Sequence, residues 1–101
     1  MIFTALCKSE RLEVVKEVKF HPKRMWRFDY CFPSLWIALE VEGGAWSNGR
    51  HTRGKGFLGD MDKYNEASRL GWIVLRTTPS KLLTMETIKL IKETAKAHGK
   101  S

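Results

Sequence analysis

Two short stretches of alternating residues, separated by Pro33-Ser34, constrain the fold of this chain more than any other feature. Residues 25–32 place aromatic side chains at every second position, and residues 35–42 do the same with mostly aliphatic side chains. Alternation with a period of two is typical of a β-strand. Because proline and serine favour a turn, we predict that the two strands form an antiparallel hairpin. One face of the first strand would carry Trp26, Phe28, Tyr30 and Phe32.

Helical patterns surround this hairpin. Apolar spacing predicts a helix over residues 2–18, although the valines there also suit a strand, and a short strand near residues 18–20 is a further alternative. Residues 57–70 predict a second helix, with Gly71 placed to cap its carboxyl end.

The end of the chain predicts one more strand and one more helix. Residues 72–77 are apolar and indicate a strand buried on both faces. Thr78-Pro79 fits a helix start, with a capping hydroxyl followed by proline. The buried stripe of that helix would be Met85, Ile88, Ile91 and Ala95. We therefore predict a single α/β domain over residues 1–101, with a mixed sheet.

Charge points to a class of partner. Lysine and arginine total 18 against 11 acidic residues, a net charge of +7, which attracts polyanions such as nucleic acid. A merely basic soluble protein is the alternative. No apolar run is long enough for a membrane span and the first residues do not resemble a signal peptide, so we expect a soluble, cytoplasmic protein without a membrane partner. Cys7 and Cys31 match no zinc or redox motif and are interpreted as reduced structural thiols.

Three carboxylates stand in the two apolar hairpin strands. Asp29 lies among aromatic residues, and Glu40 and Glu42 share one face of the second strand. Hairpin pairing would bring Asp29 close to Glu40 or one diagonal step away. Since like charges repel, such a cluster favours a bound cation. The alternative is a solvent-facing set of acids paired with nearby basic residues, namely Lys23, Arg27 or Lys63.

Oxygen-only ligands suit a hard divalent ion, Mg²⁺ or Mn²⁺. Such an ion can activate water and neutralise charge on a phosphoryl group. A basic protein that holds this ion near its surface is arranged for phosphodiester hydrolysis.

Three segments together resemble a known superfamily. They are Arg27-Phe28-Asp29, Glu40-Val41-Glu42-Gly43 and Gly71-Trp72-Ile73-Val74-Leu75-Arg76. Their order and spacing, over roughly residues 24–77, resemble the PD-(D/E)XK nuclease superfamily. The similarity is greatest to small phage-borne members and to relatives of very-short-patch-repair endonucleases.

The resemblance implies an αβββαβ restriction-endonuclease-like core, with a mixed sheet flanked by helices and a C-terminal helix. It also implies Mg²⁺-dependent cleavage of DNA in a bacterial or phage-infected host cell. Asp29 and Glu40 would be metal ligands, together with the main-chain carbonyl of Val41.

Two positions depart from the superfamily pattern or leave it open. Glu42 stands where a lysine is usual and would tune or complete the catalytic site. Lys63 on the following helix is the candidate replacement, although an exposed surface lysine is an equal alternative. An acid from the first helix often completes such sites; Glu10, Glu13 and Glu17 are candidates, and Glu17 is chosen.

Residues 49–56 are rich in glycine and basic side chains. They nearly spell a phosphate-binding P-loop, but Gly56 replaces the hydroxyl residue that binds Mg²⁺, which disfavours nucleotide binding. The loop suits a clamp on the DNA backbone. Its expected nucleic-acid contacts are Arg50, His51, Arg53 and Lys55. Trp46 would either stack on a base or fill the edge of the core.

The sequence thus predicts a metal-dependent DNA endonuclease, with branched, repair or recombination intermediates among its candidate substrates. The alternatives are a non-cleaving nucleic-acid-binding module with a nuclease-like fold and a basic structural or regulatory protein. Cleavage of both strands by so short a chain would favour a homodimer, although no interface is readable in the sequence.

Overall fold

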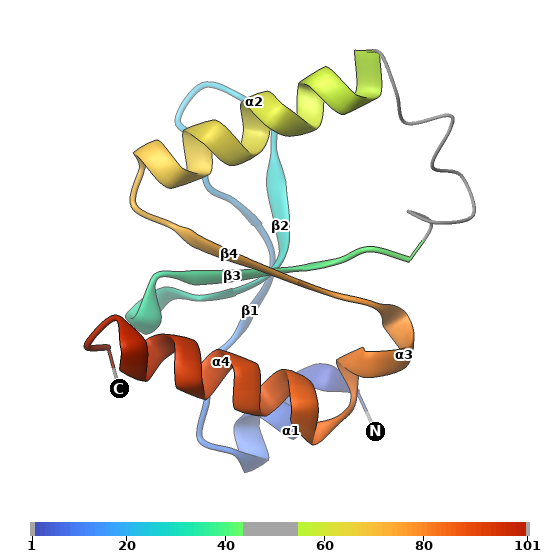
Figure 1. Cartoon of the computed structure of the whole chain (residues 1–101), viewed down its shortest axis with the longest axis vertical. Helices are drawn as coiled ribbons and strands as arrows, with labels where there is room; N and C mark the ends of the chain where they lie inside the picture. Colours follow the sequence, from blue (N-terminus) through green and yellow to red (C-terminus); the bar gives the residue numbers. More distant parts are fainter. Residues whose placement is uncertain (1, 44–54, 101) are drawn as a thin grey trace.

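The structure, a computed structural model, describes residues 2–43 and 55–100, without the side chains of residues 55–58. A four-stranded sheet lies between α2 on one face and α1 and α4 on the other, so the fold has three layers (Figure 1). The elements are α1 (Phe3–Ser9), β1 (Val15–Lys19), β2 (Arg27–Phe32), the 3-10 turn Pro33–Leu35, β3 (Ile37–Val41), α2 (Lys55–Arg69), β4 (Ile73–Thr77), α3 (Pro79–Leu82) and α4 (Met85–Ala97). The predicted mixed α/β sheet with flanking helices and a C-terminal helix is confirmed.

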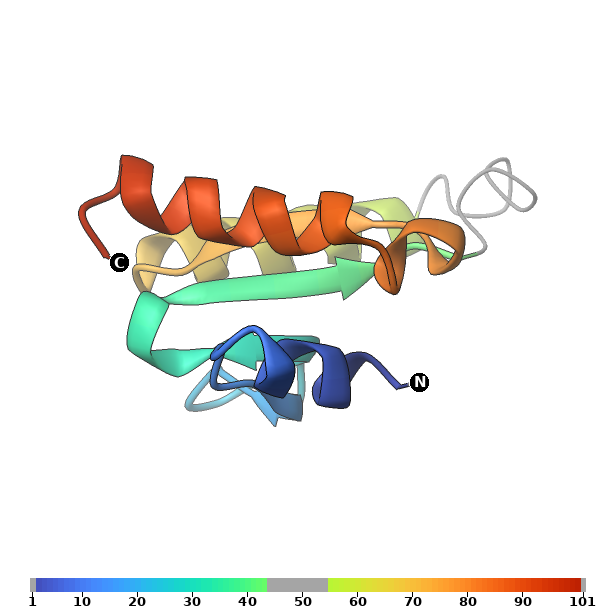
Figure 2. The same ribbon diagram turned by 90° about the horizontal axis from the view of Figure 1, so that it is seen from below.

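The strands follow one another across the sheet in the order β1-β2-β3-β4. β2 is antiparallel to both β1 and β3, which confirms the predicted hairpin. β4 runs parallel to β3, with Glu40 beside Arg76. Parallel neighbours cannot be joined by a tight turn, so the chain crosses one face of the sheet through α2. α1 and α4 both lie on the opposite face, toward the viewer of Figure 2.

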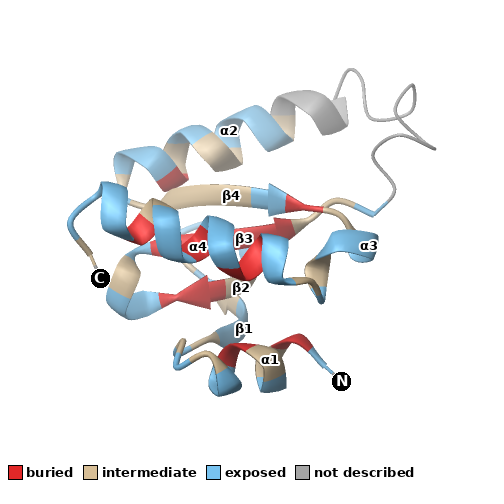
Figure 3. Cartoon of the chain, turned by 60° about the horizontal axis from the view of Figure 1, so that its bottom comes forward, coloured by how far each residue is buried: buried red, intermediate tan, exposed pale blue. Residues whose placement is uncertain are grey.

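The two faces of the sheet have separate cores. The larger core joins Phe32, Ile37 and Leu39 of the sheet to side chains of α1 and α4. The smaller core lies under α2 and comprises Phe28, Cys31, Ala38 and Ala67, with Trp72 and Val74 packed against it. Figure 3 colours the buried residues red, and they lie along β2, β3 and the helices that pack on the sheet. Within residues 2–43 and 55–100, none of the helices has the length and apolar character needed to cross a membrane.

The helix predicted over residues 2–18 is wrong beyond Ser9. α1 ends there, Arg11 takes a left-handed backbone with φ of 61°, and the Leu12 amide donates to the Cys7 carbonyl oxygen at 2.8 Å. A left-handed residue stops a helix from propagating. The following valine-rich segment forms β1 instead, because β-branched side chains are favoured in strands.

The predicted hairpin faces also need a correction. Phe28 packs in the smaller core with Cys31, whereas Tyr30 and Phe32 contribute to the larger one. The alternation is broken next to Asp29, where Glu17 of the neighbouring strand has a left-handed φ of 50°. β3 begins at Ile37 rather than Leu35, since a 3-10 turn occupies the connection.

Two burial predictions for the carboxyl-terminal half are wrong. β4 is mainly half-buried because it is an edge strand of the sheet. Met85 is 54% exposed, while Ile88, Ile91 and Ala95 form the buried stripe as predicted. Gly71, with φ of 96°, follows α2 as the predicted capping glycine.

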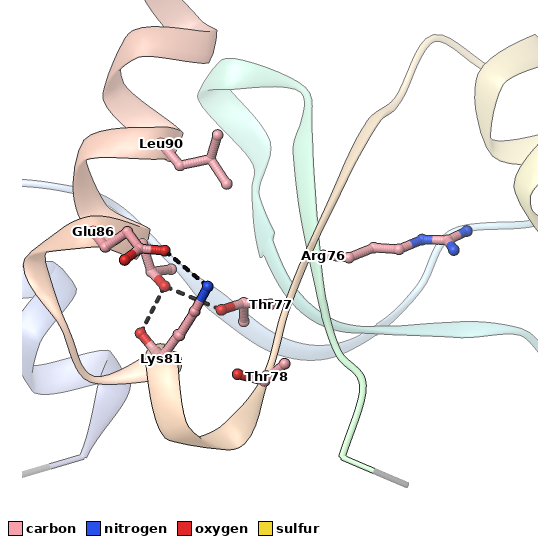
Figure 4. Close-up of a pocket in the computed structure, with 7 residues that line it drawn as sticks. Arg76, Thr77, Thr78, Lys81, Glu86 and Leu90 are labelled. Atoms are coloured by element: carbon pink, nitrogen blue, oxygen red, sulfur yellow. Dashed lines mark hydrogen bonds and ion pairs between the residues drawn. The ribbon is translucent and has the colours of Figure 1, made fainter. Parts of the chain in front are cut away.

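The predicted last helix is divided into α3 and α4. The hydroxyls of Thr84 and Thr87 each donate to the Lys81 carbonyl oxygen at 2.7 Å, which replaces the hydrogen bonds that would continue the helix. Thr87 also contacts Thr77 of β4, with their hydroxyl oxygens 3.1 Å apart. Figure 4 draws the part of this cluster that reaches Thr77 and Lys81, in a pocket that Glu86 also lines. These hydroxyls therefore connect the start of α4 to α3 and to β4.

Ile91 and Leu90 give a matched test of the larger core, because both lie on α4 but Ile91 is fully buried and Leu90 is 40% exposed. Ile91→Ala should lower the free energy of unfolding by about 3 kcal/mol, through lost burial and a cavity. Leu90→Ala should lower it by less than about 1 kcal/mol. Urea denaturation measures both, and equal losses would contradict this account of the core.

Candidate active site

Strand β2 separates from β3 near the carboxyl end of β3. The pairing of these strands extends only to Tyr30 opposite Leu39, and beyond it the Val41 amide donates to Asp29 Oδ2 at 2.7 Å. A side-chain carboxylate therefore replaces a main-chain acceptor at the next step of the ladder. This bond holds Asp29 against β3, next to Glu40, and satisfies an amide that the end of the ladder would otherwise leave unpaired.

Glu40 is a buried acid paired with a lysine. Its side chain is 9% exposed, and its Oε1 lies 3.0 Å from Nζ of Lys63, whose side chain is 15% exposed. Burial raises the pKa of Glu40 to about 7; Lys63 opposes the rise, and the neighbouring Asp29 carboxylate adds to it. A carboxyl that titrates near neutral pH beside a second acid is typical of a functional site.

Glu42, the residue that follows β3, belongs to a second cluster of polar side chains. Its Oε1 lies 3.1 Å from Nε of Arg76 on β4. This Oε1 atom is buried and makes no hydrogen bond, although 32% of the Glu42 side chain is exposed. The contact with Arg76 is therefore ionic, without the alignment of a hydrogen bond. The Arg76 guanidinium also lies over the Tyr64 ring, 4.2 Å from its centroid.

Tyr64 of α2 lies near the carboxylates of Glu40 and Glu42. Burial raises its pKa to about 12, and Glu40 and Glu42 both contribute to the rise while Arg76 opposes it. The phenol therefore stays protonated at neutral pH and keeps its hydrogen-bond donor. Tyr64 and Lys63 are consecutive on α2, so one turn of this helix carries both the lysine that pairs with Glu40 and the ring beneath Arg76.

On the other side of Asp29 the surface is hollowed. A cavity of about 360 Å³ is lined by Lys16, Glu17, Asp29, Tyr30, Val41 and Leu82. Glu17 lies between the paired positions Lys16 and Val18 of β1, which places it across from Asp29. Three of the four predicted metal ligands, Glu17, Asp29 and Val41, thus line one cavity.

The predicted residues are not all brought together. Asp29, Glu40 and Lys63 meet, whereas Glu42 pairs with Arg76, so the three hairpin carboxylates do not form one tight cluster. Over residues 2–43 and 55–100, no three acidic, histidine or cysteine side chains converge as a metal would require. Trp46, Arg50, His51 and Arg53 lie outside the described residues, as does the side chain of Lys55. Glu10 belongs to a distant ion pair with Lys92.

Comparison with protein-family models, curated proteins and solved structures found no match for this chain.

Sequence reasoning missed Arg76 and Tyr64. Arg76 enters the sequence argument only as the last residue of a strand motif, and Tyr64 only as part of the helix expected over residues 57–70. A charge within an otherwise apolar strand was the available signal for Arg76. Tyr64 gave no comparable signal. Cys31 lies nearby, but it is free and buried, and its pKa is raised to about 12, mainly by burial. It remains a protonated structural thiol.

The raised pKa of Glu40 makes folding stability depend on pH. Between pH 4.5 and about 7, the unfolded chain loses the Glu40 proton and the folded chain keeps it, so the free energy of unfolding falls as the pH rises. A shift of this size corresponds to at most about 3 kcal/mol. Glu40→Gln should abolish this part of the pH dependence.

Urea denaturation of the wild type and Glu40→Gln across this range measures the effect. Glu10→Gln is the control, because it removes one carboxylate from the Glu10–Lys92 pair on the surface. A constant difference between Glu40→Gln and the wild type throughout the range would show that Glu40 ionises in the folded protein as it does in the unfolded chain.

Proposed function

We propose that this protein is a metal-dependent DNA endonuclease that hydrolyses phosphodiester bonds. The observation that carries the proposal is the buried Glu40, which lies beside Asp29 and is ion-paired to Lys63 of the next helix. Burying a charged pair is costly and is weak evidence for a purely stabilising role. Two adjacent acids and a lysine at the open end of a sheet are the groups that metal-assisted phosphoryl chemistry uses.

The order of the elements supports the same proposal. Helix α1, three antiparallel strands, the crossover helix α2 and the parallel strand β4 follow the αβββαβ order of the PD-(D/E)XK superfamily that the sequence resembles. In that superfamily the two acids stand on neighbouring strands, as Asp29 and Glu40 do here. The net charge of +7 suits a polyanionic substrate.

The donor set fits a divalent ion of the Mg²⁺ or Mn²⁺ type. Asp29, Glu40 and the main-chain carbonyl of Val41 would hold it, all through oxygen atoms. Glu17 lines the cavity that Asp29 and Val41 share, but it does not converge with both Asp29 and Glu40, so the two acids on neighbouring strands and the Val41 carbonyl form the proposed set. Asp29 Oδ2 accepts the Val41 amide, which orients the carboxylate toward β3. When bound, such an ion polarises a phosphoryl oxygen and activates water.

Lys63 takes the role that the superfamily gives to a lysine on the strand. Its ammonium is fixed at Glu40 and carries three donors, of which the ion pair with Oε1 uses one. A further donor is available to orient water or to stabilise charge on a phosphate oxygen. Glu42, which occupies the usual lysine position, is engaged with Arg76 instead. DNA structures such as branched repair or recombination intermediates are the proposed substrates, and a homodimer is the proposed form for cutting both strands.

One observation favours a second candidate, a nucleic-acid-binding module that does not cleave. Lys63 already neutralises Glu40, and Glu42 replaces the lysine of the superfamily motif. In this alternative the buried pair serves the fold and no metal is required. Binding of DNA without any metal-dependent cleavage would support it.

The main prediction is cleavage of supercoiled plasmid and of duplex, branched and single-stranded DNA in the presence of Mg²⁺ or Mn²⁺. Asp29→Asn and Glu40→Gln should each lower the rate by about 100-fold or more, because each removes a charged metal ligand. Glu10→Gln should cleave at the wild-type rate. Gel assays of product formation measure all four proteins, and chelation of the metal should stop the reaction. Cleavage that survives both site substitutions would falsify the proposal.

Lys63 gives a separate prediction. Lys63→Met should lower the cleavage rate by about 100-fold, since a charged donor to the transition state is lost. It should leave binding of Mn²⁺ intact or stronger, because the cation that competes for Glu40 has been removed. Lys92→Met, which breaks the exposed pair with Glu10, is the matched control. Loss of Mn²⁺ binding in Lys63→Met would contradict a role in transition-state stabilisation.

A further inference from the structure

Arg76 is held in place by two unrelated contacts. Its guanidinium lies over the Tyr64 ring of α2, 4.2 Å from the centroid, and its Nε contacts Glu42, the residue that follows β3. The side chain leaves β4 on the side away from Lys81 and Glu86, as Figure 4 shows. A contact with an aromatic ring and an ion pair together restrict the positions that the guanidinium can take.

This arrangement leaves much of the binding capacity of Arg76 unused. An arginine carries five N–H donors, and the two contacts use the ring face and Nε. Neither terminal nitrogen hydrogen-bonds to a residue within 2–43 or 59–100, and 52% of the side chain is exposed. The exposed edge of a fixed guanidinium matches two oxygens of a phosphate.

The position of Arg76 relates these donors to the candidate active site. Glu40 and Arg76 are directly paired across β3 and β4, so their main chains are neighbours. Tyr64, the platform for Arg76, adjoins Lys63, which binds Glu40. An anion bound by the terminal nitrogens of Arg76 would thus lie along the same edge as the acids.

We infer that Arg76, which lies over the Tyr64 ring and is ion-paired with Glu42, is a binding site for a phosphodiester of DNA next to the candidate active site. The inference rests on the proposed function only for the identity of the anion as a DNA phosphate. Glu42 then has a defined role, since it orients the guanidinium that binds the substrate. This accounts for a glutamate at the position where the superfamily has a lysine.

A purely structural role for Arg76 makes a different prediction. A half-exposed arginine–glutamate pair contributes about 1 kcal/mol or less to stability, and its loss would not alter how DNA binding depends on salt. A phosphate contact would, because each neutralised phosphate releases counterions. The salt dependence of DNA affinity therefore separates the two roles.

The test is binding of a short fluorescently labelled DNA duplex to the full chain, followed by anisotropy in EDTA at several salt concentrations. Without metal no cleavage occurs, so the measurement is independent of the nuclease proposal. Arg76→Gln should lower affinity about tenfold near 0.1 M salt and reduce the slope of log K against log salt by about 0.9. Arg76→Lys should retain most of the slope but bind more weakly than the wild type, since it keeps the charge and loses the planar fork.

Arg69→Gln is the matched control. Arg69 is also an exposed arginine that pairs with a glutamate, Glu66, at 2.8 Å, and its removal changes the net charge equally. It should leave affinity and slope close to the wild type. Tyr64→Phe keeps the ring beneath Arg76 and should bind as the wild type does, whereas Tyr64→Leu removes that platform and should weaken binding.

The outcomes separate the two proposals. Equal slopes for Arg76→Gln and the wild type, or equal losses in Arg76→Gln and Arg69→Gln, would overturn the inference even if the protein cleaves DNA. A reduced slope specific to Arg76 would support it even if no cleavage is found, and the nuclease proposal alone would then fail. Thermal unfolding of each variant checks that it is folded at the assay temperature.

Discussion

The parallel pairing of β3 with β4 is the constraint on which the site depends. Two parallel neighbours need a crossover, and α2 is the helix that crosses between them. The crossing covers one face of β3 and places Lys63 and Tyr64 over the acids that β3 carries. Without this connection, Glu40 would face solvent and would have no partner from the helix. The topology of the sheet thus determines the electrostatics of the site.

Burial beneath α2 removes water from Glu40 and Lys63, which costs free energy of desolvation. The attraction between the two charges offsets only part of that cost. Two charged groups lose most of their hydration, and the raised pKa of Glu40 indicates that the ion pair does not fully compensate. Asp29 adds a second negative charge next to it while its own oxygen accepts the Val41 amide. A divalent cation at this point would relieve the repulsion between the two acids. The site is therefore arranged to favour added positive charge.

Glu42 and Arg76 continue the same polar edge away from Glu40. Their ion pair, the Tyr64 ring and the Glu40–Lys63 pair all converge on one turn of α2. Two acids that favour a cation, Glu40 and Glu42, are thus each paired with a base that favours an anion, Lys63 or Arg76. Phosphodiester hydrolysis requires both, since the reaction brings an anionic substrate to a metal held by carboxylates. Glu40 would help to hold the metal of the proposed activity, and Arg76 beside it would bind the phosphate of the substrate.

The sequence by itself determined the strands of the hairpin and the proximity of Asp29 to Glu40, because alternation and turn residues act between near neighbours. It did not determine that residues 15–19 form a strand, that Phe28 turns to the α2 face, or that Glu42 leaves the other acids for Arg76. Those outcomes depend on a left-handed residue at Arg11, on the break in alternation beside Asp29, and on the path of α2 over the sheet. Only the tertiary structure decided them, because the partners involved are distant in sequence and meet through packing that local periodicity does not encode.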